Sequence, residues 1–557
     1  MKGYREWNPG QASLMPASPT DWLKEDHLVY FLLELLPALD LSEIEGVIHA
    51  KDARGTRPYS PRMMVGLLLY GYCIGKVSSR KLELATYEEV PFRVLCGDHH
   101  PDHSAISNFR QRHLTALGSL FTQILALCKK AGLVKLGHVA LDGTKLKASA
   151  SKHKAASYEG MSRSEQRIAE EIGEMLERAA AADAEEDERF GKEHTGNELP
   201  EGLRTKAERL RRIQEAKAAL EADAALTKAL ERKAQAARKA KKAESTGTDA
   251  AIESAEDEGD EADRCTQQAL DLANKRLDAA REHAEELASR ADDAKGKRAA
   301  TLAQQAAERA EQDAVETQVA LGENDDEGGP DGGAAVLANE QHEPAADATT
   351  EDLPVRRTRA DRDGDPDPKA QRSYTDPDSQ LMKDGNGFSQ AYNCQAAVDQ
   401  EHQVIVAAGL TNQASDTPHL APMLDAVIGN CGAAPETFTA DAGYSSEANL
   451  EHCENVGTDA YIPSRKKAGR QAEKGPAAPP KEEDETRVER MRTKISTEEG
   501  RAIYARRKWV AEAPFGQIKE ARGLRQLLLR GMDKTKQEWN LICAGHNLLK
   551  LFRASRA

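Results

Sequence analysis

Cysteine is scarce and long apolar runs are missing from this chain of 557 residues. Its eight cysteines include no CxxC pair, which argues against a disulfide framework and fits free thiols in a reducing compartment. No apolar run approaches the roughly 18–20 residues that span a bilayer. The opening residues MKGYREWNPG lack the apolar core of a signal peptide. These absences predict a cytoplasmic protein with no membrane partner.

Positive charge is in the minority, but unevenly so. The formal net charge of −16 by itself argues against a nucleic-acid partner. Residues 156–350 hold 27 Lys and Arg against 47 Asp and Glu, whereas the rest of the chain holds 50 against 46. Residues 486–557 hold 17 basic and 7 acidic residues. An acidic central block therefore hides a basic C-terminal region, and the net charge excludes no nucleic-acid partner.

Aromatic residues are almost missing from residues 158–345, which are rich in Ala, Glu, Arg and Lys. This composition favours helices and predicts charge-paired helical hairpins or a coiled coil. Because the apolar seam is mostly Ala, it buries little surface and we expect marginal stability. The acidic stretches at residues 245–263 and 322–335 are expected to be flexible.

Four segments follow from the patterns along the chain. Residues 1–135 predict short helices and an all-helical N-terminal domain. Residues 136–157 contain the first strand of an α/β core, residues 158–370 a long helical and partly disordered acidic insertion, and residues 371–557 the remainder of the core with basic C-terminal helices. The predicted order is strand, insertion, two strands, then helices alternating with two further strands. This order indicates a mixed α/β core interrupted after its first strand.

Three acidic residues stand at special places in this scheme. The apolar strand HVALD ends on Asp142, the strand TFTAD ends on Asp441, and Glu512 lies in a late basic helix. Open α/β sheets place their sites at the carboxyl ends of strands, and three converging carboxylates suit Mg²⁺ or Mn²⁺. Two such ions clamp the attacking and leaving oxygens of a phosphoryl transfer. The alternative is that each Asp only caps the turn after it, as Asp416 is expected to cap the helix beginning DTPHLAPML.

The late helix carries a stripe at helical spacing. Its members are Tyr504, Lys508, Glu512, Phe515 and Lys519. A carboxylate flanked by cations suits an anionic substrate, whereas the alternative is a solvated charged face. Pro514 inside the helix is expected to kink it and interrupt the stripe.

Four stretches, read in order, carry a family resemblance: ALDGTKLKASASKHKA, YTDPDSQLMKDGNGFSQAYNCQAAVD, ADAGYSSEANL and YARRKWVAEAPFGQIKEARGLRQLLLRG. Together they resemble the DDE transposases of bacterial insertion sequences, over about residues 25–180 and 370–555. The last stretch is similar to their Tyr-Arg-Glu-Lys signature, with Tyr504, Arg507, Glu512 and Lys519 in its places. One extra residue separates Arg507 from Glu512, and Ala513 precedes the proline.

The resemblance implies an RNase H-like mixed sheet flanked by helices, with a helical insertion after its first strand. It implies that Asp142, Asp441 and Glu512 are the catalytic triad and bind two Mg²⁺ or Mn²⁺ ions for cleavage at element ends and strand transfer into target DNA. No covalent protein–DNA intermediate is expected. The expected partners are double-stranded DNA and further copies of the chain, as a homodimer or higher oligomer, and the bound protein would be nucleoid-associated in a bacterial cytoplasm.

DNA-binding residues follow partly from the resemblance and partly from position. The signature implies phosphate contacts by Arg507, Lys508 and Lys519 beside Tyr504. The tract after Asp142 adds Lys145 and Lys147, with Lys152 and Lys154 beyond them.

Other patterns leave alternatives open. Cys96, His99, His100 and His103 lie close in sequence and suggest zinc. The helical N-terminal domain can contain a helix-turn-helix pair that binds DNA, with Arg110, Arg112 and His113 contacting the element ends. The alternative is that these helices only pack together. A coiled-coil scaffold and a catalytically silent DNA-binding protein derived from a transposase are the rival functions.

Overall fold

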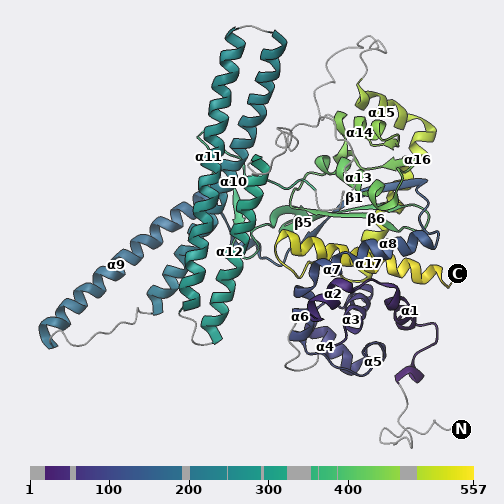
Figure 1. Ribbon diagram of the computed structural model, residues 1–557. Helices are drawn as coiled ribbons and strands as arrows, with labels where there is room; N and C mark the ends of the chain where they lie inside the picture. Colours follow the sequence, from purple (N-terminus) through teal and green to yellow (C-terminus); the bar gives the residue numbers. More distant parts are fainter. Residues whose placement is uncertain are drawn as a thin grey trace, which may run out of the picture. The chain divides into compact units, whose positions relative to one another are not determined.

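The chain forms two compact units in a computed structural model (Figure 1). The model describes residues 19–49, 58–190, 201–246, 249–289, 294–322, 353–361, 363–384, 387–464 and 486–556. The core unit comprises Met1–Ser149, Ala346–Pro354 and Tyr392–Ala557. The insertion unit comprises Ala150–Ala345 and Val355–Ala391.

Short helices fill the first part of the core unit, as the sequence predicted. They are α1 (Leu28–Leu35), α2 (Ser42–His49), α3 (Pro61–Ile74), α4 (Ser79–Glu88), α5 (Val90–Cys96), α6 (His103–Arg112), α7 (Leu114–Gly118) and α8 (Leu120–Lys130). Helix α3 begins with Pro61 at its first position and is buried along most of its length. Such a helix is a core element.

A mixed sheet forms the second part of the core unit. Its strands are β1 (His138–Lys147), β5 (Gly387–Asp399), β6 (Ile405–Thr411), β7 (Thr437–Thr439) and β8 (Asp459–Tyr461), in the order β6-β5-β1-β7-β8. Strands β1, β7 and β8 run parallel, and β5 pairs antiparallel with β6. The predicted order of strands and helices is confirmed, and so is the mixed α/β, RNase H-like fold class.

Helices cover both faces of this sheet (Figure 1). They are α13 (Leu420–Cys431), α14 (Glu447–Asn455), α15 (Arg487–Ser496), α16 (Glu498–Gly516) and α17 (Met532–Ala554). Trp539 of α17 donates its indole N–H to the Gln395 carbonyl of β5 over 3.0 Å. The Asn547 side chain of α17 bonds both the N–H and the C=O of Ile405 in β6, each over 2.8 Å.

Helix α17 also packs on the N-terminal helices. The thiol of Cys73 in α3 lies 3.5 Å from the Gly545 carbonyl of α17, and the Arg522 guanidinium donates to the Tyr72 carbonyl over 3.3 Å. Because α17 touches both the sheet and the N-terminal helices, it is the central element of the core unit.

A buried histidine of α17 makes the core unit sensitive to acid. His546 is 1% exposed, its Nε2 lies 2.9 Å from the Gln403 carbonyl, and burial lowers its pKa to about 3. In the unfolded chain the ordinary pKa is about 6.5. Below about pH 6.5 the unfolded state therefore binds the extra proton, and the free energy of unfolding falls by on the order of 1 kcal/mol for each pH unit as the pH is lowered.

We therefore expect His546→Gln to flatten the loss of stability between pH 6.5 and pH 5, because its amide keeps a donor but does not titrate. Urea unfolding of the full chain at pH 7, 6 and 5 measures this, with His402→Gln as the matched exposed control. Parallel slopes in His546→Gln and wild type would contradict the assignment.

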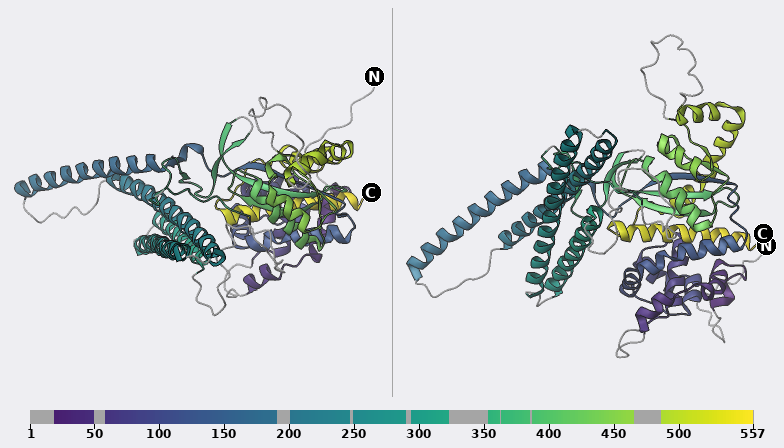
Figure 2. Two further views of the ribbon diagram at one scale, coloured as in Figure 1. Left: turned by 90° about the horizontal axis from the view of Figure 1, so that it is seen from above. Right: turned by 45° about the horizontal axis from the view of Figure 1, so that its top comes forward.

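Long helices dominate the insertion unit (Figure 2). They are α9 (Tyr158–Phe190), α10 (Glu201–Thr246), α11 (Asp249–Ser289) and α12 (Ala294–Leu321). The unit also holds a two-stranded sheet of β2 (Ala155–Ser157) and β3 (Gln371–Ser373), and β4 (Gln380–Asp384), which pairs with the first residues of β5.

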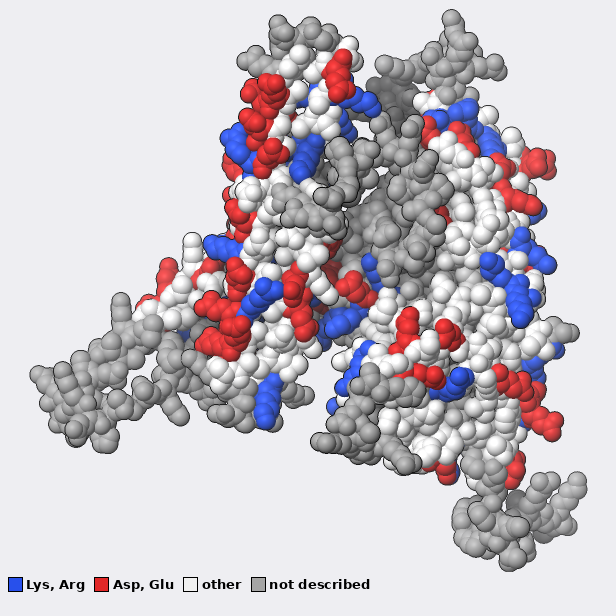
Figure 3. Space-filling view, viewed as in Figure 1, with Lys and Arg blue, Asp and Glu red and all other residues white. Residues whose placement is uncertain are grey.

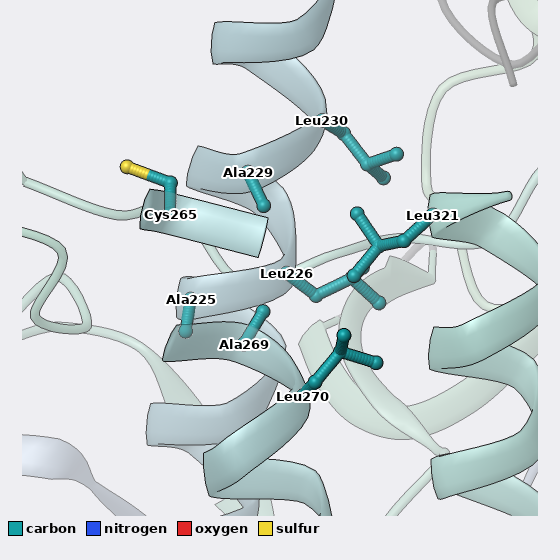
Figure 4. Packing of buried hydrophobic residues seen from close by; sticks show 8 residues of the cluster. All are labelled: Ala225, Leu226, Ala229, Leu230, Cys265, Ala269, Leu270 and Leu321. Carbon is teal, nitrogen blue, oxygen red and sulfur yellow. The ribbon is translucent and has the colours of Figure 1, made fainter. Parts of the chain in front are cut away.

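Most of the buried apolar side chains of α10, α11 and α12 are alanines, as predicted. One cluster of this seam holds more leucine than alanine (Figure 4). Its buried members are Ala225, Leu226, Ala229, Leu230, Cys265, Ala269, Leu270 and Leu321. Charged pairs flank it, such as Arg232 with Glu258 and Arg276 with Asp313, at 2.9 and 2.6 Å. Acidic and basic side chains intermingle on the surface of these helices (Figure 3). The predicted charge-paired hairpins are confirmed.

One expectation about the acidic block is wrong. Residues 249–263, expected to be flexible, form the first turns of α11. Opposite charges across the helix pair explain the order, since Glu258 accepts from Arg232 and Lys239 of α10. Residues 247–248 and 323–335 lie outside the described residues. Within the described ranges, no helix has the length and apolar character of a membrane span.

Candidate active site

Asp142 lies inside β1 rather than at its end. The parallel pairing with β7 covers His138–Ala140, but the strand continues to Lys147. The expectation that the strand stops on Asp142 is therefore wrong. Backbone bonds explain the continuation: Lys147 N–H donates to the Arg525 carbonyl, and Leu527 N–H donates to the Lys147 carbonyl. Asp142 lies two residues after the segment that pairs with β7, just as Asp441 lies two residues after the paired segment of β7.

The Asp142 carboxylate is held by two donors in a partly buried place. Its side chain is 18% exposed. Arg507 Nη1 donates to Oδ2 over 3.1 Å, and the Gly143 N–H donates to Oδ1 over 2.8 Å. Burial raises the pKa of Asp142 to about 6; Arg507 opposes the shift and the charge of Asp441 adds to it. Asp142 and Asp441 are therefore close enough to interact electrostatically, beyond the paired segments of β1 and β7. Two neighbouring negative charges at this place favour a bound cation.

Asp441 follows β7 by two residues and begins the short 3-10 helix η5 (Ala442–Tyr444). Its Oδ1 accepts from the Gly443 N–H over 2.7 Å, so this carboxylate does cap the turn after it, while Oδ2 has no part in that bond. A Cβ at residue 443 would lie 2.7 Å from that same Oδ1. A larger residue at 443 would therefore push the carboxylate away from the turn.

Glu512 lies on α16, which continues through Pro514 and ends at Gly516. The expected break is instead a change of helix type, because a π-helical turn follows over Gln517–Ala521. The Glu512 side chain is 49% exposed, and Arg507 Nη2 lies 3.9 Å from its Oε1. Arg507 thus stands between the first and third acids.

The three acids suit a hard divalent ion by their chemistry. All the donors are carboxylate oxygens, which Mg²⁺ and Mn²⁺ prefer, and Asp142 already holds a cationic partner in Arg507. Among the described residues, however, no three His, Cys, Asp or Glu side chains lie close enough together to hold a metal ion. The structure brings Asp142 and Asp441 to one edge and places Glu512 on the far side of Arg507.

The expected DNA-contacting residues fall into two groups. Lys145 Nζ lies 3.3 Å from Asp416 Oδ1, Lys519 Nζ donates to the Lys145 carbonyl over 2.9 Å, and the Tyr504 ring lies 5.8 Å from the Arg507 guanidinium. These side chains face the site itself. Lys147 and Lys508 are exposed.

A fourth carboxylate at the site was not found from the sequence. Asp416 begins the 3-10 helix η4 (Thr417–His419) but its side chain caps nothing, so the expected cap is wrong. Its Oδ1 accepts instead from Asn393 and Gln395 of β5, over 2.7 and 3.0 Å. The signal in the sequence was the pair of alternate polar residues Asn393 and Gln395 in a mostly apolar strand. Both are 0% exposed, and buried polar side chains need a hydrogen-bond partner such as Asp416.

Tyr444 was also missed. It is 0% exposed and donates its hydroxyl to Gln395 Oε1. Burial raises the pKa of Tyr444 well above its usual value, and the charges of Asp416, Asp142 and Asp441 add to the shift. One buried phenol therefore lies in the field of three carboxylates.

The structure bears on both alternatives that the sequence left open in the N-terminal helices. His103 Nδ1 lies 2.8 Å from Glu83 and Cys96 is buried; no zinc-type cluster occurs in the part of the chain that the structure describes. Arg110 is 4% and His113 6% exposed, and Arg110 donates to the Val77 carbonyl over 2.7 Å. These two side chains stabilise helix packing, whereas Arg112 is exposed. DNA binding by these helices stays a prediction.

Comparisons with known proteins give two family matches. The model described as "Transposase DDE domain" matches residues 351–548, and the one described as "Transposase domain (DUF772)" matches residues 18–112. The first match covers Asp441 and Glu512, and the second covers α1 to α6. No curated protein and no solved structure matches the chain.

Proposed function

Because the chain belongs to the DDE-type transposases of insertion sequences, we propose that it cleaves DNA at the ends of such an element and joins the freed ends to target DNA. One observation carries the proposal. Asp142 and Asp441 are far apart in sequence but follow the paired segments of neighbouring parallel strands, and Arg507 connects Asp142 to Glu512.

Two phosphoryl transfers make up the proposed reaction. In the first, a water oxygen attacks a phosphorus atom at the element end, the bond to the 3′ oxygen breaks, and a 3′ hydroxyl is released. In the second, that hydroxyl attacks a phosphodiester of the target, so one phosphodiester bond forms as another breaks. No net oxidation or reduction occurs in either step.

Asp142, Asp441 and Glu512 would hold two Mg²⁺ or Mn²⁺ ions, which when bound lower the barrier by polarising the attacking and leaving oxygens. Arg507 neutralises Asp142 and reaches toward Glu512, so its guanidinium is placed beside the phosphate that the acids would meet. The exposed Lys147 and Lys508 would bind the flanking phosphates. Lys145, Lys519 and Tyr504 would stabilise the site through their contacts with Asp416, the Lys145 carbonyl and Arg507.

We further propose that the chain acts on double-stranded DNA in a bacterial cytoplasm, associated with the nucleoid when bound. Two element ends must be brought together for joining, so a homodimer or higher oligomer on DNA is the expected assembly. The basic C-terminal region supplies the charge that DNA requires, with 17 basic and 7 acidic residues in residues 486–557.

Cleavage of end-containing DNA by the purified full chain tests the function. The substrate is a duplex carrying the inverted repeats that flank the open reading frame, and the expected product is a nick with a 3′ hydroxyl that forms only with Mg²⁺ or Mn²⁺. A scrambled duplex is the control. Tight binding without any cleavage at any metal concentration would indicate a catalytically silent DNA-binding protein instead.

A further inference from the structure

Three donors from two strands converge on one oxygen of Asp416. Asn393 Nδ2 and Gln395 Nε2 of β5 lie 2.7 and 3.0 Å from Oδ1, and Lys145 Nζ of β1 lies 3.3 Å from it. The Asp416 side chain is only 23% exposed. A carboxylate with this many donors is firmly oriented.

The same carboxylate lies against the backbone beside Asp142. A Cβ at residue 143 would lie 3.0 Å from Asp416 Oδ1 and would collide with the Gln395 amide. Glycine at residue 143 therefore lets the backbone lie against the side chains of Gln395 and Asp416. Since Gly143 directly follows Asp142 and donates to it, the position of Asp416 limits where Asp142 can lie.

On its other side Asp416 lies against the turn that carries Asp441. A Cβ at residue 443 would lie 3.4 Å from Asp416 Oδ2, and the hydroxyl of the next residue, Thr417, donates to the Gly443 carbonyl over 2.7 Å. The turn that carries Asp441 is therefore hydrogen-bonded to η4.

Tyr444 closes the network. Its hydroxyl donates to Gln395 Oε1, and the other end of that amide donates to Asp416. Asn449 of α14 donates to both the Thr417 and the Tyr444 carbonyls over 2.7 Å. Strands β1 and β5, η4 and η5 are thus joined through buried polar groups around Asp416.

We propose that Asp416 is a positioning residue, which fixes the separation of Asp142 and Asp441 by hydrogen bonds and so prepares the two acids to share a divalent ion. This rests on the proposed function. Because the three donors meet at Oδ1, an asparagine at residue 416 can still accept them, whereas an alanine cannot. The role therefore depends on the oxygen more than on its charge.

The experiment compares Asp416→Ala, Asp416→Asn and wild type as full chains. Binding of Mn²⁺ without DNA is measured by the electron paramagnetic resonance signal of the free ion, and cleavage rate is measured separately. We expect Asp416→Ala to weaken Mn²⁺ binding by about 10- to 100-fold, the range seen when groups supporting metal ligands are removed. Asp416→Asn should stay within about fivefold of wild type.

Controls separate positioning from folding. Asp425→Asn removes a carboxylate of α13 that pairs with His452 at 2.8 Å and should leave Mn²⁺ binding unchanged. If Asp416→Ala melts before the assay temperature, Tyr444→Phe, which loses only the hydroxyl, should weaken Mn²⁺ binding in its place.

Three results would overturn the proposal: wild-type Mn²⁺ binding in both Asp416→Ala and Tyr444→Phe, equal damage by Asn and Ala at residue 416, or no Mn²⁺ binding by wild type. Failure of the wild type to cleave DNA while it binds Mn²⁺ would count against the proposed function alone.

Discussion

Asp441→Asn is expected to lower DNA cleavage by on the order of 10³-fold or more while leaving DNA binding in place. The amide oxygen can still accept the Gly443 N–H that caps η5, so the turn should persist. The variant loses one negative charge close to Asp142, whose pKa is raised in part by the charge of Asp441. Asp142→Asn and Glu512→Gln should have effects of similar size. Single-turnover cleavage of end-containing duplex, with binding measured in the same buffer, tests all three.

Asp425→Asn is again the matched control, because it removes a carboxylate of the core unit that lies 41% exposed on α13. It should cleave at the wild-type rate. Full activity in any one of the three active-site variants would remove that residue from the assignment. Equal loss of binding and cleavage would instead point to misfolding.

Asn547→Ala should destabilise the core unit by about 3 kcal/mol or more. Asn547 is 0% exposed, and its amide satisfies both backbone groups of Ile405 in β6. Alanine would leave a buried N–H and a buried C=O without these partners, and each unsatisfied group costs about 1–3 kcal/mol. Urea unfolding followed by tryptophan fluorescence measures the loss.

The exposed Asn455 at the end of α14 provides the comparison. Asn455→Ala should change stability by less than about 0.5 kcal/mol. A loss below about 1 kcal/mol in Asn547→Ala would show that Ile405 finds other partners, and that the amide is not what joins α17 to the sheet.

The sequence was sufficient for the order of the elements, and it singled out the three acids, whose catalytic role stays a prediction. Hydrophobic alternation, helix-start residues and the four family stretches act locally, so residues near Asp142, Asp441 and Glu512 carry the information themselves. The partner of the last residues of β1 was not predictable in this way. These residues are strand because the segment around Gln526, far along the chain, supplies the backbone partners of Lys147.

Asp416 shows the same limit at the site. An Asp before a Thr-Pro pair looks like a helix cap, and nothing nearby in sequence contradicts that. Only the fold reveals that Asn393, Gln395 and Lys145 converge on it. The flexibility expected for residues 249–263 failed for a similar reason, since the balancing cations lie on α10 and not within the acidic stretch.

The central place of α17 delays closure of the core unit during synthesis on the ribosome. Residues 148–386 separate β1 from β5, and at roughly 5–20 residues per second the first strand waits on the order of ten seconds or more for its neighbour. The N-terminal helices wait longer still, because their partner α17 is made well after β5. A nascent chain therefore has no closed core unit until α17 has been made, and we expect no competence for DNA before that point.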